Sequence, residues 1–303
     1  MQPTANVLRR AQYLFGTICR IEAHVHRPQE AQAAVQAGFD ALLAVERCLN
    51  PHNPDSELSR LNARAARQPM PVSSLLFHCI LRALDVCAAT EGRYDITAWP
   101  LLSLWRDHAR IERRPSAAAL DAAVSAIDYR NVCLDVAART VAFADERIQI
   151  DLSSIVKGFA LDRALEAMRA FAIESAGLDA GGELLFWRLD GEPVCVGIAD
   201  PLDRGTVRRT VWLRNRAVAT SGQGETRLSI GGRAIGHVFD VRTGLPLSDD
   251  RPSATVIAAD AATADLLSTA AFVLGEARLH PLQSFYPDSI FLFTESEAPA
   301  WAG

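Results

Sequence analysis

Apolar residues recur with two different periods along this chain, and each period predicts a different kind of element. An apolar residue at every third or fourth position predicts helices over residues 29–49, 73–92, 116–127, 158–172 and 260–274. Alternating apolar and polar residues predict strands at residues 15–26, 132–136, 141–144, 147–152, 184–189, 194–199, 207–213, 217–219, 226–230, 235–241, 254–258 and 290–294. Strands therefore dominate after residue 180.

Two stretches fit neither period. Residues 94–105, YDITAWPLLSLW, are rich in aromatic residues and contain Pro100, which predicts a loop. Residues 106–114 are strongly charged, so we expect a solvated surface segment there.

The mixture of elements predicts an α+β fold in which helices pack on mixed, largely antiparallel sheets. No tandem repeat or low-complexity linker divides the sequence. A chain of 303 residues can form one large domain or two closely packed lobes, and we expect a single domain over residues 1–303.

Composition excludes several classes of function. The net charge is −5 and no basic block occurs, so nucleic-acid binding is not expected. The six cysteines are scattered without C-x-x-C or Cys/His ligand spacing, which favours a reducing compartment and argues against structural zinc. No apolar run is long enough to span a bilayer. The first 15 residues lack the pattern of a secretory or lipoprotein signal, so we expect a cytoplasmic protein.

Lys157 is the only lysine among 31 basic residues. It stands in IDLSSIVKGFALD, where an expected strand, two serines and Lys157-Gly158 lead into a helix. Backbone N–H groups at a helix N-terminus, together with a compact cation, suit an anion such as phosphate. A capped helix with an exposed lysine explains the same stretch equally well.

Asp265 and Thr269 stand four residues apart on an expected helix, so their side chains share one face. One carboxylate with a hydroxyl suits Mg²⁺, which keeps water and phosphate oxygens in its coordination shell. Asp265 could instead serve only the dipole of its helix. His237, expected at a strand end, could act as a general base or be a structural histidine.

The order of these motifs is more specific than any one of them. The chain contains FGT, PDSELSRLN, YDITAWPLLSLW, IDLSSIVKGFALD, GLDAGGE, AVATSG, GHVFDVRTGLP and SATVIAADAATADLLSTAAFVLG, in this order. This series closely resembles the ApbE-like FAD:protein FMN transferases and covers nearly the whole sequence.

The resemblance implies an ApbE-like, T-fold-related architecture of two lobes in one domain, with FAD as substrate and Mg²⁺ as metal. It places Ser154, Asp265 and Thr269 at the metal, with Ser268 beside them. It gives His237 the activation of the acceptor hydroxyl and Lys157 a catalytic cation at the phosphates. The residues that it assigns to FAD binding are Phe15, Arg93, Tyr94, Asp95, Asp151, Lys157 and Phe239.

The reaction implied is transfer of FMN from FAD to a Ser or Thr hydroxyl of an acceptor flavoprotein, with release of AMP. A metal-dependent FAD pyrophosphatase and a non-catalytic FAD-binding protein are the alternatives. The chain departs from the family pattern mainly around the expected flavin pocket. The departures are Phe15 for Met, His52 for Tyr, Ala98-Trp99 for Val-Gly, Asp179 for Asn and Val241 for Pro.

Overall fold

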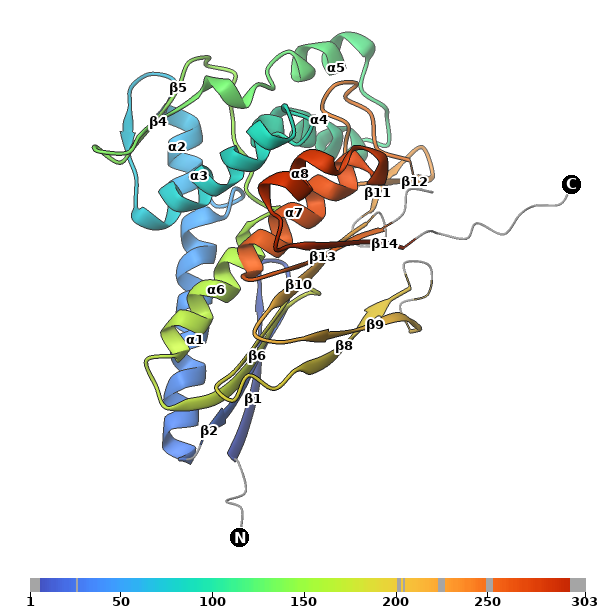
Figure 1. Ribbon diagram of the computed structural model, residues 1–303. Helices are drawn as coiled ribbons and strands as arrows, with labels where there is room; N and C mark the ends of the chain where they lie inside the picture. The colour runs from blue at the N-terminus through green and yellow to red at the C-terminus, as the bar shows by residue number, and fades with distance from the viewer. Residues whose placement is uncertain are drawn as a thin grey trace, which may run out of the picture.

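A seven-stranded sheet forms the centre of the computed structural model, which describes residues 6–25, 27–200, 203, 205–222, 227–248 and 253–294 (Figure 1). Every pair of neighbouring strands runs antiparallel. In spatial order the strands are β1 (Asn6–Leu14), β2 (Thr17–Val25), β6 (Ile173–Ala180), β7 (Leu184–Arg188), β10 (Ala217–Ser221), β13 (Ser253–Ala258) and β14 (Ile290–Thr294).

Three smaller antiparallel sheets complete the strand structure of the described residues. Their strands are β3 (Met70–Pro71), β5 (Thr140–Phe143) and β4 (Val132–Asp135) in one sheet, β8 (Val194–Ala199) and β9 (Val207–Leu213) in the second, and β11 (Arg227–Ile230) and β12 (Arg233–Gly236) in the third. The prediction of an α+β fold with largely antiparallel sheets is confirmed.

Helices cover one face of the large sheet and the β8–β9 hairpin lies on the other (Figure 1). The covering helices are α1 (Pro28–Leu49), α6 (Val156–Met168) and α7 (Ala261–Leu274). The hairpin packs through a separate apolar cluster in which Val196 and Leu213 meet Val218 of β10 and Ile257 of β13. The large core therefore lies between the sheet and the three helices.

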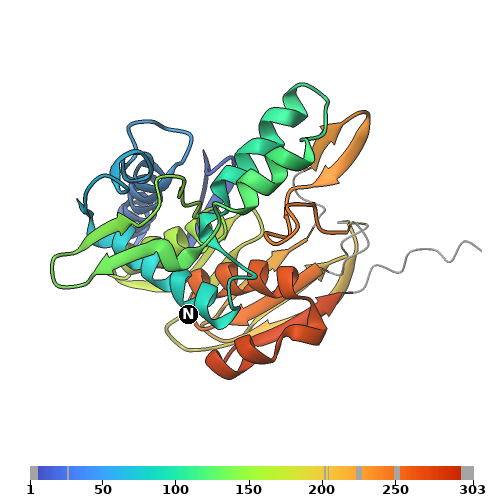
Figure 2. The ribbon, with the colours of Figure 1, turned by 90° about the horizontal axis from the view of Figure 1, so that it is seen from above.

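The remaining helices gather at one end of the sheet. They are α2 (Glu57–Arg64), α3 (Ser74–Ala89), α4 (Trp99–Arg110), α5 (Ala117–Val124), α8 (His280–Phe285) and the 3₁₀ turns η1 (Ile96–Ala98), η2 (Tyr129–Asn131) and η3 (Glu276–Arg278). From above, the β11–β12 hairpin lies beside the α4–α5 pair (Figure 2). Within the described ranges, no helix has the length and apolar character that a membrane crossing requires.

Helix caps were predicted accurately from single side chains. Ser73 accepts a hydrogen bond from the backbone N–H of Leu76 at 3.2 Å, and Asp260 accepts one from Thr263 at 2.8 Å. These oxygens satisfy N–H groups that have no partner within their own helix. Gly275 ends α7, as expected.

Two strands of the large sheet, β1 and β6, were not predicted. The expected first strand, residues 15–26, is β2 of a hairpin whose other strand, β1, was not predicted, and Phe15-Gly16 forms the turn with φ angles of 53° and 75°. Such a turn needs two positive φ angles, which a non-glycine residue adopts only at some cost. Strand β6 was also missed, and α6 ends at Met168 rather than at residue 172.

The expected loop over residues 94–105 is instead η1 followed by α4. Pro100 lies in the first turn of α4, where a missing N–H costs no hydrogen bond. Residues 106–110, expected as a solvated segment, belong to the same helix.

Residues 147–152 do not form the predicted strand. This extended segment is held by the side chain of Asn62, whose amide donates to the Ile150 carbonyl and accepts from the Ile150 N–H, both at 2.9 Å. The next predicted element, α6, begins at Val156 rather than at Gly158. Strand β12 ends at Gly236, so His237 follows the strand instead of lying within it.

Candidate active site

A cavity of about 550 Å³ opens where several chain reversals meet at one end of the large sheet. Because neighbouring strands are antiparallel, the β1–β2 turn, the β6–β7 turn and the end of β10 lie at the same end of the sheet. The start of α6, one face of α7, α4 and the segment after β12 provide the other walls. Elements far apart in sequence thus contribute to one site.

The contact between α6 and α7 is very close at Gly158. A Cβ atom there would lie 2.1 Å from the carbonyl oxygen of Ala261. Every residue other than glycine would make this overlap, so the close contact requires glycine. The N–H of Gly158 donates to Oδ2 of Asp265 at 2.9 Å. Asp265 is 3% exposed, so its carboxylate is fixed at the N-terminus of α6 by this bond.

Hydroxyl groups gather beside this carboxylate. The Ser221 hydroxyl, at the end of β10, lies 3.1 Å from the Thr269 hydroxyl and 2.8 Å from that of Ser268. Thr269 stands one helical turn after Asp265, and both residues line the cavity. Ser268 is buried and bonds the Asp265 carbonyl at 2.8 Å, so it supports α7 instead of lining the cavity.

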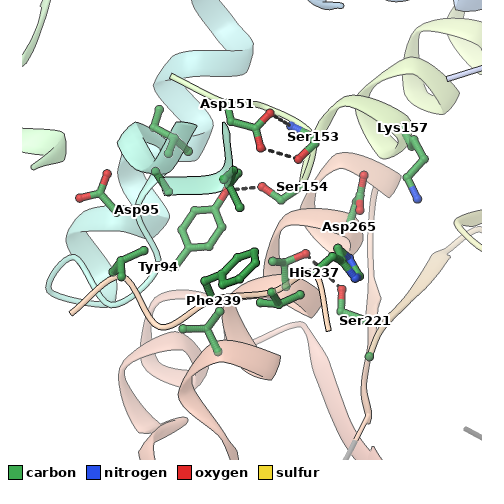
Figure 3. Close-up of a pocket in the computed structure, with 18 of the residues that line it drawn as sticks. Tyr94, Asp95, Asp151, Ser153, Ser154, Lys157, Ser221, His237, Phe239 and Asp265 are labelled. Carbon is green, nitrogen blue, oxygen red and sulfur yellow. Dashed lines mark hydrogen bonds between the residues drawn. The ribbon is translucent and has the colours of Figure 1, made fainter. Parts of the chain in front are cut away.

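The opposite wall carries Tyr94 and Ser154, whose hydroxyls lie 2.5 Å apart (Figure 3). Burial raises the pKa of Tyr94 well above its ordinary value, so the phenol stays protonated. Asp151 accepts hydrogen bonds from the Ser153 hydroxyl at 2.6 Å and the Ser153 N–H at 3.3 Å. These bonds fix the turn that presents Ser154.

Lys157 forms an ion pair with Glu183, with 2.5 Å between Nζ and Oε1. Their side chains are 21% and 6% exposed. Both groups that suggested an anion site at the start of α6 therefore have acidic partners. Glu183 already faces the lysine, and Asp265 already accepts from the Gly158 N–H.

Asp95 lines the cavity, but its carboxylate is used to hold η1 in place. It accepts from the N–H and hydroxyl of Thr97 at 2.8 and 2.7 Å, and from the Tyr129 N–H at 2.9 Å. Burial raises the pKa of Asp95, and the bonds to Thr97 and Tyr129 oppose that effect. This geometry favours a positioning role for Asp95.

His237 and Phe239 reach the cavity from the segment after β12 (Figure 3). The Phe239 ring stacks on Trp105, with 5.4 Å between ring centroids and 22° between planes. The Trp105 indole N–H donates to the Gly244 carbonyl at 2.7 Å. Phe239 is therefore held rigidly from behind, while His237 lies on the side of Asp265 and Ser221 (Figure 3).

The donors present fit a hard divalent cation. Asp265, Thr269, Ser154 and Ser221 offer only oxygen, which is the preference of Mg²⁺. Among the described residues no group of three His, Cys, Asp or Glu side chains comes together. Protein donors alone are thus too few, and a bound phosphate would have to complete the coordination.

All eleven residues assigned to the site by resemblance line this one cavity. They are Phe15, Arg93, Tyr94, Asp95, Asp151, Ser154, Lys157, His237, Phe239, Asp265 and Thr269. Two charged wall residues were given no role in advance, Glu183 and Arg106. Glu183 lay within the quoted GLDAGGE motif, whereas Arg106 was assigned to the solvated segment because α4 was not predicted.

The fold and the cavity together define a class of protein, an α+β domain with one mixed polar and apolar site. Its hydroxyls, carboxylates and lysine suit the phosphates of a ligand, and its apolar wall suits a ring. The model of the ApbE family matches residues 15–289. The chain therefore belongs to the ApbE family.

Curated relatives and a solved structure agree with this assignment. The FAD:protein FMN transferase of Treponema pallidum is 32% identical over 97% of this chain and 86% of its own length. The enzyme of the same name from Vibrio cholerae is 30% identical over 87% and 80%. The ApbE protein of Thermotoga maritima superimposes with a TM-score of 0.83 at 28% identity, covering 96% of this chain and 97% of its own.

Proposed function

We propose that this chain transfers FMN from FAD to a Ser or Thr hydroxyl of an acceptor flavoprotein and releases AMP, with Mg²⁺ as the metal. The observation that carries this proposal is the convergence of eleven residues from distant segments on one cavity. The curated relatives, named FAD:protein FMN transferase, supply the substrate class. We further propose that residues 1–303 act as one catalytic domain in the cytoplasm, which the buried free thiols of Cys79 and Cys87 support.

In the proposed reaction the acceptor hydroxyl oxygen forms a bond to the phosphorus of the FMN half. The bond from that phosphorus to the bridging oxygen breaks, and AMP leaves with this oxygen. His237 takes the proton of the hydroxyl as general base. No covalent intermediate on the enzyme is needed, because one displacement at phosphorus completes the transfer.

The other cavity residues bind and orient. Lys157, positioned by Glu183, supplies positive charge towards the pyrophosphate, and Phe239 offers a flat apolar surface to a ring. Mg²⁺ held by Asp265 and Thr269, with Ser154 near, would neutralise phosphate charge in the transition state. Since the protein supplies few ligands, metal and FAD should bind with positive coupling.

The test is a single assay with two readouts. FAD and Mg²⁺ are incubated with the protein, with and without a candidate acceptor, and AMP and the mass of the acceptor are measured. Transfer predicts AMP only with acceptor, together with the mass increase of an FMN phosphoester. AMP without acceptor would identify a pyrophosphatase instead, and absence of AMP in both reactions would indicate a binding protein.

A His237→Asn variant separates catalysis from binding. Loss of a general base lowers the transfer rate by about 10²- to 10⁴-fold, whereas FAD affinity should stay near that of wild type. An unchanged rate would remove His237 from the proposed chemistry. His108→Asn is the matched control, because His108 lies outside the cavity and contacts the Arg113 carbonyl at 3.1 Å.

A further inference from the structure

Arg106 is a cavity-wall cation with a buried, unsatisfied donor. It is half-buried on α4, and its Nη1 atom is enclosed without a hydrogen-bond partner among the residues that the structure describes. Leaving a charged N–H donor enclosed without an acceptor is costly. Arg110, one turn further along the same helix, is exposed and pairs with Asp107 at 3.0 Å. The two arginines therefore have different roles.

Trp99 holds the Arg106 guanidinium in this unfavourable place. The guanidinium carbon lies 5.3 Å from the centroid of the Trp99 ring, a cation–π contact. Residues 99 and 106 are two helical turns apart and share one face of α4. A long cationic side chain at a cavity rim normally turns its head to water, and this stack opposes that movement.

His52 supports the stack from the other side of Trp99. Its ring lies 5.6 Å from the Trp99 ring, tilted by 55°. Burial and the nearby Arg106 charge lower the pKa of His52, so its ring is neutral at pH 7 and adds no repulsion.

Apolar side chains line the cavity together with Arg106. Leu102 lies one turn before it on α4, and Leu228, Phe239 and Val241 line the same cavity. Phe239 is backed by Trp105 and presents a rigid flat surface. An apolar wall with one fixed donor suits a planar heterocycle that carries a hydrogen-bond acceptor on its edge.

We propose that Arg106, positioned by Trp99, is a specificity-determining residue that donates to a ring-edge acceptor of bound FAD. This inference rests on the proposed use of FAD. Both ring systems of FAD have such acceptors: the carbonyls and ring nitrogens of the isoalloxazine, and the ring nitrogens of adenine. The contact gives the half-buried Arg106 guanidinium an acceptor, and it makes binding depend on the ring rather than on the phosphates alone.

The test measures dissociation constants by titration of the purified full chain with FAD, FMN and ADP, each in the presence of Mg²⁺. The variants are Arg106→Met, which keeps the aliphatic length, and Arg110→Met as the matched control on the same helix. A lost charge-assisted hydrogen bond predicts roughly ten- to hundredfold weaker FAD binding by Arg106→Met. Arg110→Met should bind FAD like wild type.

The fragments identify the ring. We expect Arg106→Met to weaken the binding of one fragment, either FMN or ADP, to the same extent as that of FAD. The affinity for the other fragment should stay unchanged. Unchanged FAD affinity would overturn the proposal. So would equal weakening of both fragments, or equal weakening by Arg110→Met, because a general charge effect would then explain the result. If wild-type protein fails to bind FAD, the proposed function itself fails.

Trp99 is tested as a positioning residue by a double-mutant cycle. Trp99→Leu alone should weaken FAD binding by a smaller factor than Arg106→Met does. In the Arg106→Met background, Trp99→Leu should cause no further loss of FAD affinity. Thermal melts of all variants show whether α4 remains folded. Additive effects of the two substitutions on FAD affinity would contradict the positioning role.

Discussion

Replacing Gly158 by alanine tests the contact on which the site is built. The added Cβ would lie 2.1 Å from the Ala261 carbonyl oxygen, 2.5 Å from the Ala261 carbonyl carbon and 2.7 Å from Cβ of Asp265. Two of these neighbours are backbone atoms, so a side-chain rotation cannot relieve the overlap. The helices α6 and α7 must separate by about 1 Å to restore ordinary contact.

The magnitude follows from two effects. Overpacking costs about 1–3 kcal/mol, and losing the hydrogen bond from the Gly158 N–H to the Asp265 carboxylate costs about 1.5–3 kcal/mol. Alanine regains about 1 kcal/mol as the better helix former. We therefore expect the free energy of unfolding to fall by roughly 1.5–5 kcal/mol. Because Asp265 moves with α7, the Mg²⁺ concentration needed for half-maximal transfer should also rise.

Urea unfolding and an Mg²⁺ titration of FAD turnover measure both effects. Gly177→Ala is the control: it lies in β6, and its added Cβ would stand 3.6 Å from the Phe186 ring, an ordinary contact. That variant should match wild type in stability and metal requirement. Wild-type stability and an unchanged metal requirement in Gly158→Ala would refute the close α6–α7 contact.

Two further predictions concern buried charges. Lys157→Met removes the cation that faces the buried Glu183 carboxylate, so it should lower the free energy of unfolding by about 3–5 kcal/mol. In urea unfolding the double variant Lys157→Met/Glu183→Gln should be more stable than Lys157→Met alone, and a less stable double variant would contradict the pairing. Burial and the neighbouring Asp260 carboxylate raise the pKa of Asp162 to about 7, although two backbone N–H groups of α7 oppose this. Between about pH 4 and pH 7 the folded protein then holds a proton that the unfolded chain has lost. The free energy of unfolding should therefore decrease as the pH rises through this range, by up to about 1.4 kcal/mol per pH unit. Measured by urea unfolding, the decrease in the free energy of unfolding from pH 5 to pH 8 should be smaller for Asp162→Asn than for wild type. Equal decreases in the two proteins would show that another group causes the effect.

Local patterns in the sequence were sufficient for most helices and strands. Caps such as Ser73 and Asp260 depend only on the next three residues, so their prediction needed no tertiary information. Helix α4 was missed although Leu101 and Trp105 stand four apart and are buried on one face. Pro100 was read as an interruption, whereas the first turn of a helix tolerates it.

The roles of the site residues could not be decided from residue patterns alone. From the residue pattern alone a helix-dipole role was the better explanation of Asp265, and only the fold shows that it meets Gly158 across 107 residues of sequence. The partner of Lys157, Glu183, lies 26 residues away on another element, so no local spacing predicts the pair. The family resemblance supplied the residues, and the antiparallel topology explains why they converge.

The role of Asp265 and Thr269 in metal-dependent transfer is tested most directly by FAD turnover measured against Mg²⁺ concentration, with thermal melts of each variant. Asp265→Ala should abolish transfer at every Mg²⁺ concentration while the protein stays folded. Thr269→Val should raise the Mg²⁺ requirement, and Thr269→Ser, which keeps the hydroxyl, should resemble wild type. If Asp265→Ala retains wild-type turnover and metal dependence, Asp265 does not hold the metal, and the proposed transfer loses the site on which it depends.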